Sequence, residues 1–224
     1  MRILAPLLLA TALTAQEAVV DRKPIKLPAP KMGTFTLDKA LKERKSDRSL
    51  TGPALSLQEL SQLLWSAQGE NRPKTNRRTV PSASARYPLE LYVVVSKGEK
   101  LAEGVYSYLT KDHTITRVRD GNPESFFGPL EHTPPWVLKT PAVFIVAGVS
   151  SRMKEYFDDP QNKDLYTFWE SGAAAQALIM QATALGLGST VVLGTDLPGV
   201  VKSAGMPEDH RVSVIIPVGR IAKQ

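Results

Sequence analysis

The spacing of apolar residues predicts two substantial helices. Residues 57–67 carry leucines and an alanine at helical spacing directly after Ser56-Leu57-Gln58-Glu59, a capping-box pattern, and Gly69 follows them. We therefore expect an amphipathic helix of about three turns that ends at Gly69. Residues 173–185 are apolar on nearly every side, which is typical of a helix buried in a core.

Runs of β-branched and aromatic residues predict the strands. Two of these runs flank Lys111-Asp112-His113 and indicate a hairpin, and another, from Ala142 to Val149, is continuously apolar as in a central strand. The predicted strands are 89–96, 105–109, 114–118, 142–149, 190–193 and 211–218. Helices and strands do not alternate strictly, so we expect an α+β fold with a central mixed or antiparallel sheet of about four to five strands flanked by helices.

The chain of 224 residues suits one sizeable domain. Residues 1–15 have the charged start, short apolar middle and small-residue end of a secretory signal peptide, and they are too short for a stable membrane anchor. Residues 16–36 contain three prolines and few apolar anchors, which predicts an extended linker, loose or wrapped around a partner. Residues 37–224 would form the folded domain.

Charge and composition exclude several classes of protein. The chain carries 28 Lys and Arg against 22 Asp and Glu, and removing Arg2 with the signal peptide leaves a net charge of +5. The cations cluster in residues 72–86, but no recognition helix, zinc spacing or aromatic RNA-binding strand accompanies them, so nucleic-acid binding is not expected. The absence of cysteine excludes disulfides, thiolate catalysis and iron–sulfur clusters, and an exported protein of this kind fits the bacterial periplasm.

Two short segments are candidates for binding an anionic cofactor. Residues 44–48, Arg-Lys-Ser-Asp-Arg, place cations and a hydroxyl within one turn, where they can converge on a phosphate, although a solvated basic helix end has the same pattern. Residues 81–85, Pro-Ser-Ala-Ser-Ala, are small enough for a flat ring to lie against the backbone, although an ordinary loop would look alike. Gly186 and Gly188 follow a helix, so they are interpreted as a helix end and not as a dinucleotide fingerprint. The three histidines are too scattered to form a metal site.

These segments, in this order and at these distances, resemble the nitroreductase superfamily of FMN-dependent oxidoreductases. The run from Arg78 to Tyr92, Arg-Thr-Val-Pro-Ser-Ala-Ser-Ala-Arg-Tyr-Pro-Leu-Glu-Leu-Tyr, resembles the SagB-type dehydrogenase branch more narrowly. The resemblance extends from about Leu41 to Gly219. It implies a nitroreductase-like fold, an intertwined homodimer, and FMN at each of two subunit interfaces, with the helix of residues 173–185 in the dimer core.

The resemblance also implies roles for particular residues. Arg44, Lys45 and Ser46 would bind the FMN phosphate and ribityl chain, and Arg48 would face the N1/O2 edge of the ring. The ring would be lined by Pro81, Ser82, Ala83 and Ser84. Leu193 and Gly194 match the segment whose backbone approaches flavin N5, and Gly219 and Arg220 match a strand end that reaches the phosphate. Arg86 and Tyr87 would lie on the substrate face.

The implied activity is transfer of two electrons as hydride through flavin N5, from NAD(P)H or another donor to a small conjugated, nitro or azoline-type substrate. No side chain need act as a catalyst and no metal is expected. Ser84 stands where the branch usually has glycine and Arg86 where it has an apolar residue, so a non-catalytic flavin- or ligand-binding protein is the alternative. A third hypothesis, an anion-binding surface protein, rests on the cations of residues 72–86.

Overall fold

The computed structural model describes residues 22–96, 98, 100–153 and 159–222, so the predicted signal peptide lies outside it. Its helices are α1 (Leu37–Glu43), α2 (Leu57–Gln68), α3 (Pro123–Phe127), α4 (Pro135–Leu138), α5 (Pro160–Ala184) and α6 (Leu197–Ser203). Its strands are β1 (Ile25–Lys26), β2 (Leu50–Thr51), β3 (Glu70–Arg72), β4 (Arg77–Arg78), β5 (Leu89–Val95), β6 (Gly104–Leu109), β7 (Thr114–Asp120), β8 (Ala142–Gly148), β9 (Gly188–Ser189) and β10 (Arg211–Ile221). Helices and a large sheet confirm the α+β class.

The sheet is larger than the four to five strands that the sequence predicts. Within the described ranges it has eight strands, in the order β1-β7-β6-β5-β8-β10-β2, with β9 beside β10, and each pairing is antiparallel. The additional strands β1, β2 and β9 have two residues each, too few to show an alternating pattern. The strand expected at 190–193 is reduced to one bridge between Val192 and Ile215.

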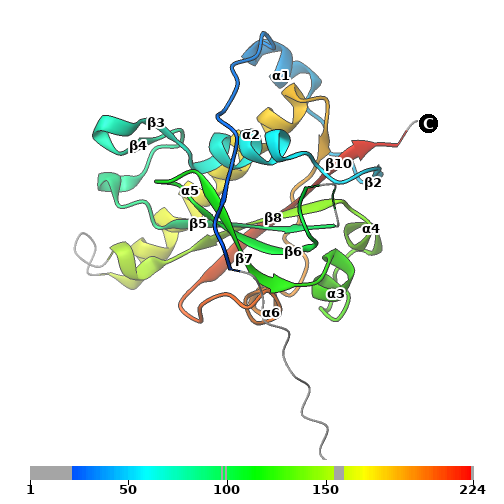
Figure 1. The fold of residues 1–224 in the computed structure, drawn as a ribbon. Coiled ribbons are helices and arrows are strands. Elements are labelled where there is room, and N and C mark those ends of the chain that lie inside the picture. The colour runs from blue at the N-terminus through cyan, green and yellow to red at the C-terminus, as the bar shows by residue number, and fades with distance from the viewer. Residues whose placement is uncertain (1–21, 97, 99, 154–158, 223–224) are drawn as a thin grey trace, which may run out of the picture.

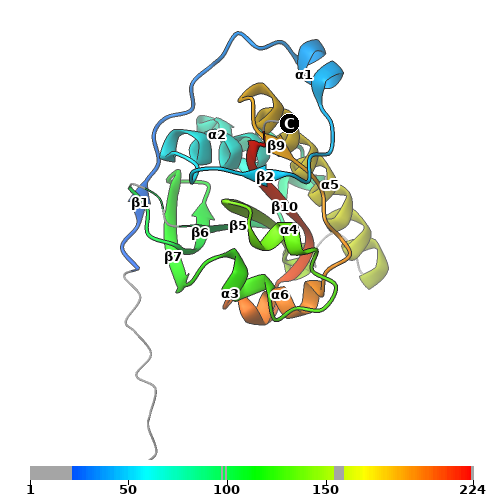
Figure 2. The ribbon, with the colours of Figure 1, turned by 90° about the vertical axis from the view of Figure 1, so that its right-hand side faces the viewer.

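Central strands of the sheet are buried on both faces, which explains their continuous apolar runs. On β8, Phe144 and Val146 belong to one hydrophobic core, whereas Val143 and Ile145 belong to another on the opposite face. Figure 2 shows the three layers, with α2 and α5 over one face and α3, α4 and α6 over the other. The molecule is therefore a sheet between two helical layers.

Both predicted helices are present. The α2 helix has the expected capping box, in which the Ser56 side chain accepts from the Glu59 N–H and the Glu59 carboxylate accepts from the Ser56 N–H. The α5 helix begins at Pro160, well before residue 173. The sequence pattern missed this start because the first turns of the helix carry polar residues that hide the apolar pattern. Of the helices in the described residues, none is both long and apolar enough to cross a membrane.

Residues 22–36 run across the domain in extended form (Figure 1). The β1 strand pairs with β7 through Ile25 and Ile115, and Leu27 is buried. Ser61 of α2 donates a hydrogen bond to the Pro28 carbonyl at 2.6 Å. This segment thus lies against its own chain.

Candidate functional site

The cationic segment of residues 44–48 lies at the C-terminal end of β10. The Asp47 N–H donates to the Ser189 carbonyl of β9 at 3.1 Å, and β2 then pairs with Arg220 and Ile221. A β-carbon on Gly188 would come within 3.0 Å of the Asp47 side chain, so glycine permits this close approach. Lys45 pairs with Asp47 at 3.5 Å. Among the described residues, no ion pair engages Arg44 or Arg48.

Three further predicted residues share this edge of the sheet. Gly219 pairs with Gly188 of β9. The residues after Gly188 run alongside β10 as far as Val192, which bonds to Ile215. Leu193 and Gly194 come next, and the Leu193 side chain is 60% exposed. A β-carbon on Gly194 would meet nothing within 4 Å. Residues 44–48 and 219 therefore lie together beside β9, whereas residues 193–194 lie farther back along the same side of β10, next to Ile215.

Arg220 is on the same edge, but its guanidinium is already engaged. It donates to both carboxylate oxygens of Glu59, at 2.6 and 3.1 Å. Burial by itself would raise the pKa of Glu59, but hydrogen bonds from Arg220 and Ser56 together hold that pKa below its ordinary value. The predicted phosphate contact of Arg220 thus competes with an ion pair that joins β10 to the start of α2.

The small-residue segment forms a tightly held loop before β5. Glu170 of α5 accepts from the Ala83 N–H at 2.7 Å and from the Ser82 hydroxyl at 3.1 Å, both through Oε1. The Ser82 hydroxyl in turn accepts from the Tyr87 N–H at 2.7 Å. Both ends of the loop are thereby joined to one buried carboxyl group.

The backbone of this loop is strained. Ser84, Ala85 and Tyr87 have φ values of 49°, 55° and 49°, in the left-handed region that non-glycine residues seldom adopt. Strain of this kind persists only where surrounding contacts hold it, and it occurs often at functional sites. The loop is thus a fixed surface and not a flexible connection.

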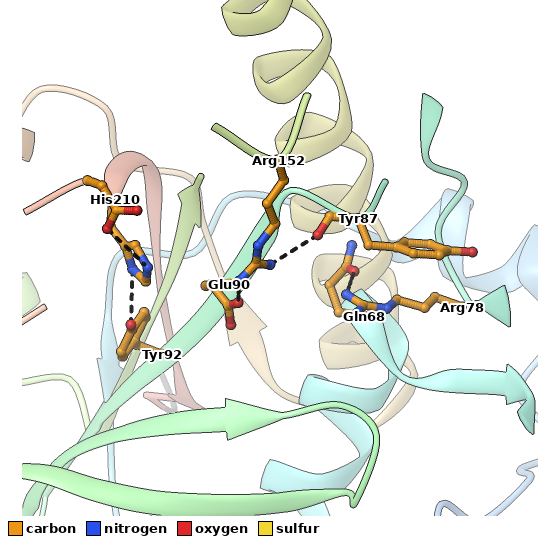
Figure 3. Close-up of polar contacts among 8 residues, drawn as sticks. Gln68, Arg78, Tyr87, Glu90, Tyr92, Arg152 and His210 are labelled. Carbon is orange, nitrogen blue, oxygen red and sulfur yellow. Dashed lines mark hydrogen bonds and ion pairs between the residues drawn. The ribbon is translucent and has the colours of Figure 1, made fainter. Parts of the chain in front are cut away.

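Tyr87, a predicted substrate residue, is fixed from several sides (Figure 3). The residue is 7% exposed, and the Arg78 guanidinium lies over its ring, 4.4 Å from the ring centroid. Its carbonyl accepts from Arg152, which also pairs with Glu90. Arg78 is oriented by the Gln68 side chain at 2.8 Å. Within this copy, Tyr87 supports the loop more than it faces solvent.

The cationic segment and the loop lie far apart in one chain. Glu170, which holds the loop, and Ala184, near β9, are separated by about 20 Å along α5. The same separation, roughly 20 Å, divides Ser213 beside α5 from Gly219 on β10. The structure therefore does not bring Arg48 and Ser82 onto one flat ring within a single copy.

Several site residues were missed from the sequence. Glu170, Gln68 and Arg152 support the loop, and Glu59 occupies Arg220. Nothing in the sequence marked Glu170, because it lies before the apolar run of residues 173–185 and its partners are 87 and 88 positions away in the chain. The described residues contain no cluster of three side chains suited to a metal. His113 and His210 lie in loops, half-buried and bonded to Tyr108 and Tyr92.

Comparisons with known proteins agree with this fold. The family model described as "Nitroreductase family" matches residues 41–220. A protein of Methanocaldococcus jannaschii named as a nitroreductase is 31% identical over 196 residues, covering 88% of this chain and 96% of its own. A nitroreductase structure from Ralstonia eutropha has a TM-score of 0.78 at 26% identity, with 90% of each chain covered. A Staphylococcus epidermidis structure named as an NAD(P)H:FMN oxidoreductase has a TM-score of 0.63 at 13% identity, covering 87% and 91%. This chain belongs to the nitroreductase family of oxidoreductases.

Proposed function

We propose that this protein is an FMN-dependent oxidoreductase whose two sites are each completed by a second copy of the chain. The observation that carries the proposal is the separation of the cationic segment from the loop of residues 81–87. Both are expected to contact the same ring, yet the parts of α5 nearest to them, at Ala184 and Glu170, are about 20 Å apart in one chain. A symmetric dimer supplies each site with one element from each subunit.

The exposed apolar residues support a dimer. Phe168 and Trp169 of α5 are 53% and 62% exposed, and Leu165, one turn before them on the same helix, is 63% exposed. Apolar surface of this kind, gathered on one helix, is typical of protein interfaces. Residues 173–185, by contrast, mostly pack into their own core, so the interface would involve the first turns of α5 more than its end.

The residues at the β10 edge fit FMN. Arg44 and Arg48 are cations without a protein ion pair in the described structure, and Ser46 lies between them, as binding of a dianionic phosphate requires. Leu193 and Gly194 leave backbone exposed at the same edge, where a ring can approach. The loop from the partner would then cover the ring with Pro81, Ser82, Ala83 and Ser84.

Bound FMN would supply two-electron redox chemistry, accepting and returning hydride at N5. The chain's own contribution is electrostatic and geometric. The Arg48 guanidinium would stabilise negative charge at the N1/O2 edge. The fixed loop would exclude water from one side and set the distance to the substrate. Lys45 is partly neutralised by Asp47 and would contribute less.

The donor and substrate follow from the resemblance and remain part of this proposal. NAD(P)H is the proposed donor, in keeping with the name of the Staphylococcus epidermidis structure. The acceptor would be a small conjugated, nitro or azoline-type molecule, as expected for a SagB-type dehydrogenase. Export to a bacterial periplasm, suggested by residues 1–15, would call for a donor available in that compartment.

The first test is the visible spectrum of purified residues 16–224 with and without added FMN. Flavin bands at ~375 and ~450 nm, bleached by NADH or NADPH and restored by an acceptor, are expected. Protein that is colourless after incubation with excess FMN and removal of unbound FMN would exclude the proposal.

Arg48→Ala provides a more specific test. Losing one uncompensated cation at the site should weaken FMN binding about ten-fold or more. Arg77→Ala removes an exposed cation of β4, so it lowers the net charge of the protein by the same amount, and it should leave FMN binding unchanged. Equal weakening in both variants would indicate a general charge effect and contradict the assigned site.

Ser84 favours one alternative, a flavin-binding protein without turnover. It holds a left-handed conformation where the related branch usually has glycine, and its side chain is exposed on the loop proposed to cover the ring. Tight FMN binding with no acceptor reduction under NADH, NADPH or dithionite-linked donors would favour this alternative.

A further inference from the structure

Glu170 is an unusual residue for its position on α5. It lies on the face of the helix that packs into the domain, and it is 1% exposed. Its neighbours on that face are Thr167, Ser171, Ala174, Leu178 and Ala182, all buried. A carboxyl group there is costly unless hydrogen bonds compensate it.

The hydrogen bonds of Glu170 are unevenly distributed. Oε1 accepts two of them, from Ala83 and Ser82, whereas the buried Oε2 has no partner within the described structure. Burial raises the pKa of Glu170 above its ordinary value, opposed by these two bonds and by the positive charge of Arg78. The domain thus retains an incompletely bonded carboxyl group that a methionine of similar volume could replace with less desolvation.

What the carboxyl group provides is the shape of the loop. It joins Ala83 directly and Tyr87 through the Ser82 hydroxyl, so its bonds enclose the left-handed residues Ser84 and Ala85 and end on the left-handed Tyr87. Without this anchor, those residues would relax toward ordinary backbone angles. The surface proposed to cover the partner's flavin would then lose its fixed form.

We propose that Glu170 is a positioning residue, which fixes the loop of residues 82–87 in the conformation that contacts the flavin held by the partner subunit. This inference rests on the proposed function. It predicts that stability and cofactor binding respond in opposite directions when the carboxyl group is removed, a combination that a purely structural residue would not give.

Glu170→Met is the decisive variant. We expect its FMN dissociation constant to rise about ten-fold or more, because a relaxed loop must be ordered on binding, while its midpoint of thermal unfolding stays equal or rises. Glu170→Gln keeps an acceptor oxygen for Ala83 and should bind FMN within about three-fold of the wild type. Ser171→Ala is the matched control: it is a buried polar neighbour that bonds to Ser213 and should change neither quantity.

Hydrogen exchange gives a second measurement that does not depend on FMN. The Ala83 and Tyr87 amides, both bonded in the wild type, should exchange about ten-fold faster in Glu170→Met. Unchanged exchange together with unchanged FMN affinity would overturn the proposal. If Glu170→Met does not fold, Glu170→Asp replaces it as the test, because its carboxylate keeps the charge but is one methylene farther from the loop. Wild-type FMN affinity in Glu170→Asp would likewise overturn the proposal.

The two proposals can fail separately. A wild-type protein that never binds FMN excludes the proposed function and the flavin contact of this loop. Wild-type binding that all Glu170 variants retain excludes the positioning role and leaves the proposed function standing.

Discussion

Ser84 shows how much a single residue can reveal about a loop. Its φ of 49° lies where a side chain is strained and glycine is not. The same segment holds Ala85 and Tyr87 in that region, so the conformation is imposed from outside by Glu170 and Ser82. Small residues at 81–85 predicted a loop, but nothing in their order predicted its strain.

Ser84→Gly should therefore stabilise the folded protein by about 0.5–1 kcal/mol, because relief of the left-handed strain exceeds the entropy that glycine adds to the unfolded chain. Urea unfolding at constant m-value measures the change. Ser151→Gly, at an exposed position with negative φ, should instead destabilise the protein by a similar amount. The same sign in both variants would contradict the strain argument.

Glu59 has one function that the sequence predicts and one that it does not. Its capping role follows from the spacing Ser56 to Glu59, a local pattern. Its pairing with Arg220 joins residues 161 positions apart, which only the fold brings together. Local hydrogen bonds are thus predictable from sequence, whereas those between distant elements are not.

The lowered pKa of Glu59 predicts a pH dependence. Because the folded-state pKa lies below the unfolded-state value near 4.5, the stabilisation is complete above that pH and is lost as pH falls through the folded-state pKa. Glu59→Gln should destabilise the protein by about 1 kcal/mol at neutral pH, and this difference should shrink in acid. Denaturant unfolding from pH 7 to 3 tests this pH dependence. The control is Glu43→Gln, at an exposed residue, which should change the free energy of unfolding little.

At the scale of elements, the packing of α5 on the sheet depends on Gly148. A β-carbon there would lie 2.1 Å from the Thr167 methyl group, so helix and strand approach more closely than any larger residue allows. The apolar run 142–149 predicted the strand but gave no reason for its glycine. That reason is supplied by Thr167, on a helix turn outside the predicted apolar segment.

Gly148→Ala should destabilise the protein by about 1–3 kcal/mol through overpacking. Thr167→Ser removes the opposing methyl group and keeps the hydroxyl that donates to the Lys163 carbonyl. The double variant should therefore recover a large part of the loss, which a double-mutant cycle in denaturant unfolding measures. Additive effects would show that the two groups are not in conflict.

Elements with strong patterns are the ones that sequence predicts well. The α2 helix and strands β5, β6, β7, β8 and β10 appear close to their expected positions, because each carries enough residues to show its period. The strands β1, β2 and β9 depend on pairing with neighbours that are distant in the chain. The sheet was consequently underestimated at its two edges, and one of those edges holds most of the candidate site.

At the scale of the whole molecule, the exposed apolar side chains of α5 locate the interface of the proposed dimer. Trp169→Glu places a charge on this surface and should shift the protein to monomers in sedimentation velocity, with parallel loss of FMN binding. Leu109→Glu introduces the same charge at a comparably exposed residue of β6 and should leave assembly intact. A Trp169→Glu protein that remains dimeric and yellow would place the interface elsewhere.

The distance between residues 44–48 and the loop also has a genetic consequence. Two defective chains, one carrying Arg48→Ala and the other Glu170→Met, should restore activity when they are co-expressed, because their heterodimer contains one site built from two intact elements. Random pairing would restore about a quarter of the wild-type number of sites. Growth or colour recovered in cells that express both variants would thus show that the two elements of one site come from different subunits.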